Sequence, residues 1–487
     1  MSDTLSNNLA DQITENQGLK LSKIEKKIAI NISRIFAFRM LGLFIILPIF
    51  SLYADKLSGS TPFLMGLALG VYGLMAGIMQ APMGLLSDYF GRKKIITIGL
   101  ILFFLGSLLA GFSHSILGVI LGRSLQGLGA VGSSLMALLA DSTRDEVRFK
   151  AMSMIGMTIG LTFMLSMIIG PILGKFIGLS GIFYLTAFLS LIGLLILWFG
   201  IPSVRSIFHK DQEFNYLDLK IIFKSKSLWI LNLSVFILHG VLTSTFLVLP
   251  ILLFKKLGLG LNHQWMMYLP VLIIAFSLVI PLIILGEKRR ILKLLMAVSA
   301  LILILVELVF IHFAYFYDSI LGIATALVLF FFAFTLLEAI MPSLVSKIAK
   351  PTVRGTAMGV YASSQFLGIF AGGALGGYLS STSLGLVFIA SFVICLVWLV
   401  LIIAMPRPSY LATRILKINK ITNPEDLKKA QHFLKHIPGV VHVYMDSGLD
   451  SGLDSGFDHV YLKIDTDRFE DEKLFSYSAL LSKNSFE

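Results

Sequence analysis

Long apolar runs separated by short polar loops dominate this chain and constrain its fold more than any other feature. A helix that crosses a bilayer needs about 20 mostly apolar residues. Only 14% of the residues are charged and 56% are apolar, whereas soluble domains carry about 25% charged residues. The sequence therefore predicts an all-α membrane protein with twelve transmembrane helices, at residues 29–53, 61–83, 95–112, 115–140, 151–175, 181–201, 228–254, 264–286, 291–314, 319–345, 355–380 and 383–405.

Lysine and arginine residues gather in the loops on one side of these predicted spans. The loops on the opposite side carry only four, Lys56, Lys175, Lys255 and Lys256. Because cytoplasmic loops are enriched in basic residues, we expect a multi-pass protein of the plasma (inner) membrane with both termini in the cytoplasm. The formal charge of +12 arises from these loops, so it indicates a lipid bilayer and no nucleic-acid partner.

Composition divides the chain into five parts. Two six-helix halves flank a polar linker, and they share an internal repeat, since the fifth span begins RFKAM at Arg148 and the eleventh begins RGTAM at Arg354. The polar N-terminal tail lacks the apolar core of a signal peptide, so we expect no cleavable signal. The predicted parts are a cytoplasmic tail (1–28), an N-terminal half (29–201), a linker (202–227), a C-terminal half (228–405) and a cytoplasmic domain (406–487).

The cytoplasmic domain has the sequence pattern of a small soluble module. Residues 412–418, 440–445 and 459–465 alternate as strands do. Residues 424–437 begin at an Asn-Pro pair with an acidic first turn and end before a Pro-Gly pair, as a helix does. This β-α-β-β order, completed by a helix near 468–481, predicts a ferredoxin-like α+β fold.

The sequence contains little that indicates a metal ion or a cofactor. The repeat DSGLDSGLDSGFD places an aspartate at every fourth position from Asp446 to Asp458. It could bind Ca²⁺, but its spacing differs from that of an EF-hand loop, and an expanded hairpin turn is the alternative that we favour. Cys395 is the single cysteine, which excludes an intramolecular disulfide and a cysteine metal framework. We therefore expect no metal and no cofactor.

A charged loop between the second and third spans carries a specific motif. It has the pattern G-x-L-x-D-x-x-G-R-K, with Gly84, Asp88, Gly91 and Arg92 at its defining positions. This pattern resembles the loop signature of the major facilitator superfamily, whose members usually have a basic residue where this chain has Tyr89. The resemblance implies a secondary transporter with twelve helices in two halves.

Together with the predicted C-terminal domain, the motif resembles the YajR-type branch of that superfamily. The resemblance implies a proton-driven exporter of the drug-exporter type, whose partners are protons and a small molecule. We expect a monomer and no enzyme activity, because the sequence shows no phosphate loop, metal cluster or nucleophile elbow outside the spans. Two alternatives stay open: a proton-coupled importer or facilitator, and a membrane sensor that signals through its C-terminal domain.

Several ionisable residues lie within the predicted spans, where they are costly and commonly functional. Arg123 and Gln126 of the fourth span resemble the superfamily's R-x-x-Q-G motif, in which the arginine is thought to assist proton transfer; a structural ion pair is the alternative. Glu338 of the tenth span is our first candidate for the proton carrier, because low-dielectric surroundings favour the protonated carboxyl group. A gate-stabilising pair is the alternative.

Three further ionisable residues are candidates for proton coupling or for the cavity. His239 of the seventh span titrates in the physiological range, although a lone histidine is often only a hydrogen-bonding partner. Glu307 has equally apolar surroundings, but its ninth span is peripheral in the family. Arg39 of the first span could attract an anionic part of a substrate or pair with a carboxylate. Tyr361 and Gln365 of the eleventh span could contact substrate or simply pack.

The fifth span carries Gly160, Gly170, Pro171 and Gly174. They partly resemble the glycine-proline motif of antiporters in the superfamily and would act as a helix-bending motif, because glycine and proline let helices approach closely and bend. Ser166 and Lys175 replace two expected glycines.

A conformational latch is the last expectation. Asp88, Arg92 and Asp141 should form a charge cluster that closes the cytoplasmic side when the cavity faces outward. In the family the loop aspartate also meets the start of the eleventh helix, here near Gly355, where free backbone N–H groups favour an anion.

Overall fold

The computed structural model describes residues 21–202, 216–316, 319–349, 353–406, 411–419, 432, 434–446 and 457–465. The chain divides into two compact units, and each is described by itself. The first contains Met1–Phe208 and Phe214–Met405, and the second contains His209–Glu213 and Pro406–Glu487. The predicted helix over 424–437, most of the aspartate repeat and the predicted helix near 468–481 lie largely or wholly outside the described residues.

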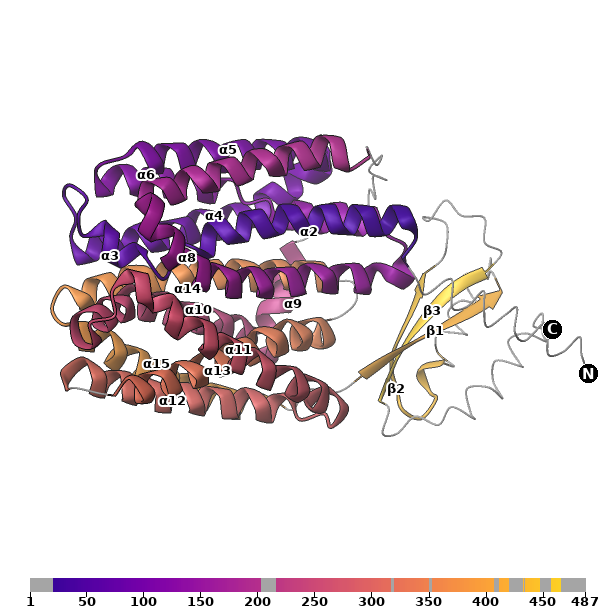
Figure 1. Cartoon of the computed structure of the whole chain (residues 1–487). Coiled ribbons are helices and arrows are strands. Elements are labelled where there is room, and N and C mark those ends of the chain that lie inside the picture. The colour runs from indigo at the N-terminus through magenta and orange to yellow at the C-terminus, as the bar shows by residue number, and fades with distance from the viewer. Residues whose placement is uncertain are drawn as a thin grey trace, which may run out of the picture. The chain divides into compact units, whose positions relative to one another are not determined.

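The first unit is a bundle of long helices that run along one common direction (Figure 1). Its first half begins with a capping box, in which Ser22 and Glu25 satisfy each other's backbone N–H groups. The elements of this half are α2 (Lys23–Phe44), α3 (Phe50–Ala54), α4 (Pro62–Phe90), α5 (Arg92–Phe112), α6 (Ile116–Leu128), α7 (Gly132–Asp141), α8 (Asp145–Leu195) and the π-helix η1 (Ile196–Gly200).

The second half starts after a short linker helix, α9 (Tyr216–Lys224), which the sequence analysis did not predict within 202–227. The long helices that follow are α10 (Lys226–Leu257), α11 (Leu261–Lys288), α12 (Leu292–Tyr315), α13 (Ile320–Ile348), α14 (Arg354–Ser380) and α15 (Leu384–Ala404). All of them coincide with predicted apolar runs.

In the described part of the chain, nine helical segments are long and apolar enough to cross a membrane. They cover ten of the predicted spans, because Lys150–Gly200 is a single segment of 51 residues that contains the predicted fifth and sixth. Only Gly178, with φ 64° and ψ −173°, departs from helical geometry inside α8. The other two, α2 and α14, are helical but more polar, with lysines at the start of α2 and glycines and serines along α14.

Two predicted spans are interrupted in the structure. The first, expected at 29–53, is helical to Phe44, continues as a turn and resumes as α3. The fourth, expected as one helix over 115–140, breaks after Leu128 and restarts at Gly132. The sequence GLGAVG spans this break, and glycine is a poor helix former.

The two halves meet most closely where α4 packs against α14. Glycines on α4 face the backbone of α14, so that a Cβ added to Gly70 would lie 2.8 Å from the carbonyl oxygen of Phe370. The close approach runs from Gly66 to Gly77. A Cβ on Gly355, at the start of α14, would meet nothing within 4 Å. The α4–α14 pair is therefore tightly closed towards Pro62 and Ser380 and open towards Phe90 and Arg354.

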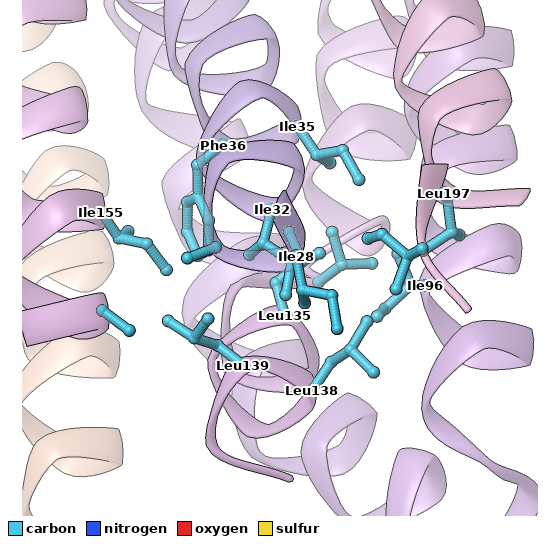
Figure 2. Close-up of a cluster of buried hydrophobic side chains, with 14 of the residues drawn as sticks. Ile28, Ile32, Ile35, Phe36, Ile96, Leu135, Leu138, Leu139, Ile155 and Leu197 are labelled. Atoms are coloured by element: carbon cyan, nitrogen blue, oxygen red, sulfur yellow. The ribbon is translucent and has the colours of Figure 1, made fainter. Parts of the chain in front are cut away.

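A buried apolar cluster holds the first half together at the end that carries the 84–96 loop (Figure 2). Ile28, Ile32 and Phe36 of α2 project into it, and Leu135 and Leu139 of α7 meet them. All five side chains are at least 97% buried. This packing fixes α7 against α2 and thereby positions the start of α7 next to the middle of α2.

The second unit contains three strands, β1 (Leu411–Asn419), β2 (Val440–Asp446) and β3 (Phe457–Asp465), at the positions predicted from the sequence. They form an antiparallel sheet in the order β1-β3-β2. Leu411 pairs with Asp465 and Val443 with Leu462. The buried face of β3 consists of Val460, Leu462 and Ile464, which alternate as expected for a strand with one covered side.

Candidate functional site

Three polar side chains from three helices of the second half meet inside the bundle. His239 lies on α10, Glu338 on α13 and Gln365 on α14. The Nε2 atom of His239 is 3.6 Å from Oε1 of Glu338 and 2.8 Å from Nε2 of Gln365. The structure thus brings together His239 and Glu338, which the sequence indicated as candidates for proton coupling, and Gln365, which was expected either to contact substrate or simply to pack.

The hydrogen bonds around His239 define its tautomer. Its Nδ1 atom lies 3.2 Å from the carbonyl oxygen of Val235, which can only accept, so Nδ1 carries a proton and donates. The amide nitrogen of Gln365 then donates to the lone pair of Nε2. The imidazole is therefore neutral in this arrangement, and its single acceptor position is occupied by Gln365.

Glu338 has no such partner. Its Oε1 atom is buried without a hydrogen bond in the described part of the chain, and 30% of the side chain is exposed. Because its neighbours come from α10 and α14, this exposed part faces the inside of the bundle. A protonated Glu338 could donate to Nε2 of His239, but only in place of Gln365. The three residues therefore offer two alternative hydrogen-bond patterns that differ by one proton.

Aromatic rings close this cluster on the side of the first half. The ring of Phe334 lies 5.6 Å from His239, and Phe163 of α8 stacks on Phe334 at 5.5 Å. Phe163 also contacts Phe331 at 6.0 Å. The polar cluster is thus bounded by a contact between the two halves, which must change when the halves move.

Arg123 is buried in the first half and is held by neutral groups. Its Nη1 donates to Oε1 of Gln126 at 3.0 Å, and Nε donates to the carbonyl oxygen of Ala68 at 3.4 Å. The guanidinium carbon lies 4.9 Å from the ring centroid of Tyr72, a cation–π geometry. Gln126 donates in turn to Ser107 at 2.7 Å. Within the described residues no carboxylate pairs with Arg123, so the predicted alternative of a structural ion pair finds no partner there.

Arg39 of α2 shares Tyr72 with Arg123. Its Nη2 donates to the Tyr72 hydroxyl at 3.1 Å, whereas Nε and Nη1 are buried without a partner in the described part of the chain. Gln80 of α4 lies nearby, and its Oε1 is also buried and unpaired. Tyr72 and Gln80 were not identified from the sequence. They lie on a glycine-rich helix, and their spacing matches no motif that would mark them as site residues.

Glu307 occupies a different environment. It is fully buried on α12, and neither of its oxygens has a hydrogen-bond partner among the described residues. It does not belong to the cluster around His239. The Thr245 hydroxyl of α10 lies close enough to interact with Glu307. Because a buried carboxyl group is expected to be protonated, Glu307 is chemically able to hold a proton, outside the cluster around His239.

The loop motif forms a charge cluster at the end of the bundle where α4 and α14 are apart. Arg92 pairs with Asp88, donates from Nε to Asp141 at 3.0 Å and donates from Nη1 to Ser87 at 2.8 Å. Asp88, Arg92 and Asp141 are therefore in contact within the first half, at an end where α4 and α14 are apart, and their role in closing the cytoplasmic side in the outward-facing state stays a prediction. A Cβ on Gly84 would lie 3.3 Å from Oγ of Ser133 and meets no residue of α14.

The second half has a comparable pair with the charges exchanged. Glu287, at the end of α11, accepts from Nζ of Lys347 at 2.8 Å and from Oγ of Ser343 at 3.0 Å, both on α13. Arg92 at the start of α5 and Asp141 at the end of α7 hold the corresponding place in the first half. The segment GEKRR at residues 286–290 occupies the place in the second half that the loop motif holds in the first. It keeps an ion pair, although it lacks the aspartate of the loop motif.

The glycine-proline motif of α8 faces the interrupted first helix. A Cβ on Gly170 would lie 2.7 Å from the carbonyl oxygen of Ile45, and the carbonyl of Gly174 accepts from the Tyr53 hydroxyl. Gly160 is open, with Phe276 at 3.9 Å from an added Cβ, and Pro171 lies inside the helix. The described residues contain no group of three or more His, Cys, Asp or Glu side chains that could hold a metal ion.

Comparisons with known proteins agree on one family. A family model described as Major Facilitator Superfamily matches residues 34–373. The inner membrane transport protein YajR of Escherichia coli (strain K12) is 36% identical over 461 residues, which cover 93% of this chain and 98% of that protein. A transporter of Buchnera aphidicola subsp. Schizaphis graminum, described as uncharacterized, is 36% identical over 384 residues, 78% of this chain and 97% of that protein.

Solved structures show the same fold at low sequence identity. A bacterial homologue of the human lysosomal transporter Spinster, in an inward-facing and occupied conformation, aligns with a TM-score of 0.66 at 15% identity over 80% of this chain and 98% of that one. A D-xylose-proton symporter aligns with a TM-score of 0.62 at 16% identity over 79% of this chain and 99% of that one. At these identities the likeness concerns the fold alone.

Proposed function

Because this chain belongs to the major facilitator superfamily and is a multi-pass secondary transporter, we propose that it couples inward proton movement to the export of a small amphipathic molecule by alternating access. The transporter has no enzyme activity in this proposal. We further propose that it lies in the inner membrane with both termini in the cytoplasm. The preference of basic loops for the cytoplasmic side and the name of the YajR relative support this placement.

The contact of His239 with Glu338 and Gln365 carries the proposal of proton coupling. In the unprotonated state Gln365 donates to His239, which ties α14 to α10. When a proton binds Glu338, its hydroxyl competes for the same Nε2 atom, which frees Gln365 and removes one tie between α14 and α10. Because α14 packs on α4 of the other half, a local change of one proton can bias the contact between the halves. A ligand or proton shifts such an equilibrium only by its differential affinity for the two states.

The packing of α4 on α14 supports an inward-facing assignment for this structure. The pair is closed towards Pro62 and Ser380, and open at the end that carries Arg92 and Asp141. If the basic loops are cytoplasmic, the open end faces the cytoplasm. We propose that in the outward-facing state the start of α14 near Gly355 approaches Asp88, whose carboxylate would then meet free helical N–H groups. The ion pair with Arg92 would keep the Asp88 carboxylate at the position from which it can make that contact.

The finer architecture is also a proposal. We place twelve crossings in two six-helix halves, by counting the two arms of α8 separately and adding the more polar α2 and α14. We assign the second unit to a ferredoxin-like fold. The order β1-β3-β2 with antiparallel neighbours makes β1 and β2 parallel to each other, as a right-handed crossover through a helix requires.

Proton flux across reconstituted vesicles tests the proposal. We expect Glu338→Gln to abolish flux that depends on an added compound, because the amide keeps the shape of the side chain but cannot titrate. The compounds are a panel of amphipathic anions, neutral molecules and cations, and a dye trapped in the vesicles reports pH. Asp55→Asn, which changes an exposed carboxylate in the turn after α3, serves as the matched control. Unchanged flux in Glu338→Gln would overturn the assignment of the proton site.

The direction of transport has its own readout. The vesicles carry the transporter with its cytoplasmic side facing inward, and the outside solution is then made acidic. An exporter should release a trapped compound under this pH gradient, whereas an importer should accumulate the compound inside. A facilitator would move the compound equally with and without the pH gradient. A sensor would show no movement of any compound, yet it would respond in its C-terminal unit.

A further inference from the structure

Two buried guanidinium groups contact a single tyrosine. Arg39 and Arg123 are each 2% exposed. Arg39 donates to the hydroxyl of Tyr72, and Arg123 lies against the ring of the same residue. Within the described chain neither arginine forms an ion pair with a carboxylate. Buried charges are costly unless they are paired, so this region has an excess of positive charge that an anion would neutralise.

The broken fourth span adds a helix N-terminus at the same place. Helix α7 begins at Gly132 inside the apolar segment Ile116–Asp141, and no side chain caps it. The first backbone bond of this helix runs from the Leu135 nitrogen to the Val131 oxygen. The N–H groups of Gly132 and Ser133 therefore precede the hydrogen-bonded ladder and are free for an acceptor. The helix dipole makes this end favourable for negative charge.

Gly132 marks the point where these groups converge. A methyl group placed there would lie 3.0 Å from Nε2 of Gln80 and 3.7 Å from Nη1 of Arg39. Nη1 is one of the two Arg39 nitrogens without a partner. The donors of Arg39, Gln80 and the start of α7 thus converge on Gly132, where the flexible end of Gln80 already lies closer than an added Cβ would normally tolerate. Gly132 and Ser133 are themselves only partly buried, so a small group can approach these donors when the Gln80 side chain shifts.

We propose that Arg39, Gln80 and the N-terminus of α7 at Gly132 form a binding site for a carboxylate group of the transported molecule. This inference rests on the proposed transport function, whose substrate it narrows to amphipathic carboxylates. One oxygen of a carboxylate can accept from the unpaired Nη1 of Arg39 and the other from the N–H groups at the start of α7, and the carboxylate neutralises one of the two buried charges. Half-helix N-termini in the middle of a membrane are suited to anionic substrate groups. A cationic substrate would be repelled by both arginines.

Binding to the full chain in lipid nanodiscs tests the site without any need for transport. The probe is phenylacetate, and its neutral isostere phenylacetamide is the reference. Because a ligand that binds only the folded state stabilises it, we expect phenylacetate, and not phenylacetamide, to raise the melting temperature of the wild-type protein. The apparent affinity for phenylacetate follows from the concentration dependence of that rise.

Two variants probe the site from different sides. Gly132→Ala places a methyl group 3.0 Å from Nε2 of Gln80 and so pushes that donor aside, but it retains all charges. Alanine also suits a helix better than glycine does. We expect at least about a tenfold loss of affinity for phenylacetate, the effect of losing one hydrogen bond to a charged group. Gly156→Ala is the matched control, since a Cβ at that position meets nothing within 4 Å. Arg39→Gln should remove the preference for phenylacetate over phenylacetamide.

The outcomes separate this proposal from the transport function. Glu338→Gln should still bind phenylacetate, so binding without proton flux would support the carboxylate site even if the proton assignment failed. Equal stabilisation by phenylacetate and phenylacetamide, or unchanged affinity in Gly132→Ala, would overturn the site. Saturation by chloride alone, with no further rise on adding phenylacetate, would also overturn the carboxylate assignment.

Discussion

A single ion pair fastens the start of α2 to the junction between α7 and α8. Glu25 accepts three hydrogen bonds from Arg144, from its backbone nitrogen at 3.0 Å, from Nε at 3.0 Å and from Nη2 at 3.1 Å. It also accepts from the backbone nitrogen of Ser22 at 2.7 Å within the capping box. The guanidinium of Arg144 is the main reason that the pKa of Glu25 falls from 4.5 to about 2.

The magnitude follows from that difference in pKa. A fall from 4.5 to about 2 corresponds to about 3 kcal/mol of stabilisation of the folded state. Arg144 is 49% exposed, although the Glu25 side chain is only 9% exposed, and solvent screening of such a pair reduces the figure to about 1–2 kcal/mol. Because the folded-state pKa is lowered, this stabilisation is complete above pH 4.5 and is lost as the pH falls from 4.5 towards 2.

Glu25→Gln isolates the charge, because glutamine can still complete the capping box. In nanodiscs at pH 7 we expect its melting temperature to lie about 2–4 °C below that of the wild type. The difference should shrink below pH 4.5 and vanish near pH 2. Arg144→Gln and the double variant complete a double-mutant cycle. A loss in Glu25→Gln that is the same at pH 3 as at pH 7 would refute the ionic explanation and leave packing as the cause.

Three further predictions concern the interior and the loop motif. Arg123→Met leaves no carboxylate behind, since Gln126 is neutral, so we expect abolished transport in vesicles with little change in melting temperature; a strongly lowered melting temperature would contradict this. Gly70→Val forces a side chain against the carbonyl of Phe370 and should widen the spin-label distance between the close-packed ends of α4 and α14. An unchanged distance would argue that the contact is easily deformed. Asp88→Asn should slow transport and leave ligand binding nearly unaltered, and equal losses in both measurements would show that the loop shapes the cavity itself.

The positions of the helices could be predicted well from the sequence, because long apolar runs identify membrane helices. The sequence also predicted that Arg92 would meet Asp88 and Asp141, because a short loop and the end of a neighbouring helix lie at one membrane surface. The three strands of the second unit followed from their alternation. In each case the signal is local, or is fixed by which end of a helix a residue occupies.

Contacts between helix faces could not be predicted in the same way. The meeting of Arg39 with Tyr72 and Gln80 depends on the rotation of α2 and α4 about their own axes, and glycine-rich helices carry no amphipathic face that would reveal it. The glycines from Gly127 to Gly132 were a visible signal for the break between α6 and α7, because three glycines within six residues weaken a helix. The residues around these glycines are apolar throughout, so hydropathy alone predicts one continuous span.

Gly178 has a consequence for how the protein is made. It is the only non-helical residue within the 51 residues of α8, so the two arms are joined with almost no connecting loop. Because the connection is so short, we expect the two arms to enter the membrane as a pair. The backbone at φ 64° and ψ −173° is open almost only to glycine, and other residues there are strained by about 1–3 kcal/mol. Since no atom lies within 4 Å of an added Cβ, we expect a substitution at this position to act through backbone strain at the junction of the two arms and not through side-chain packing.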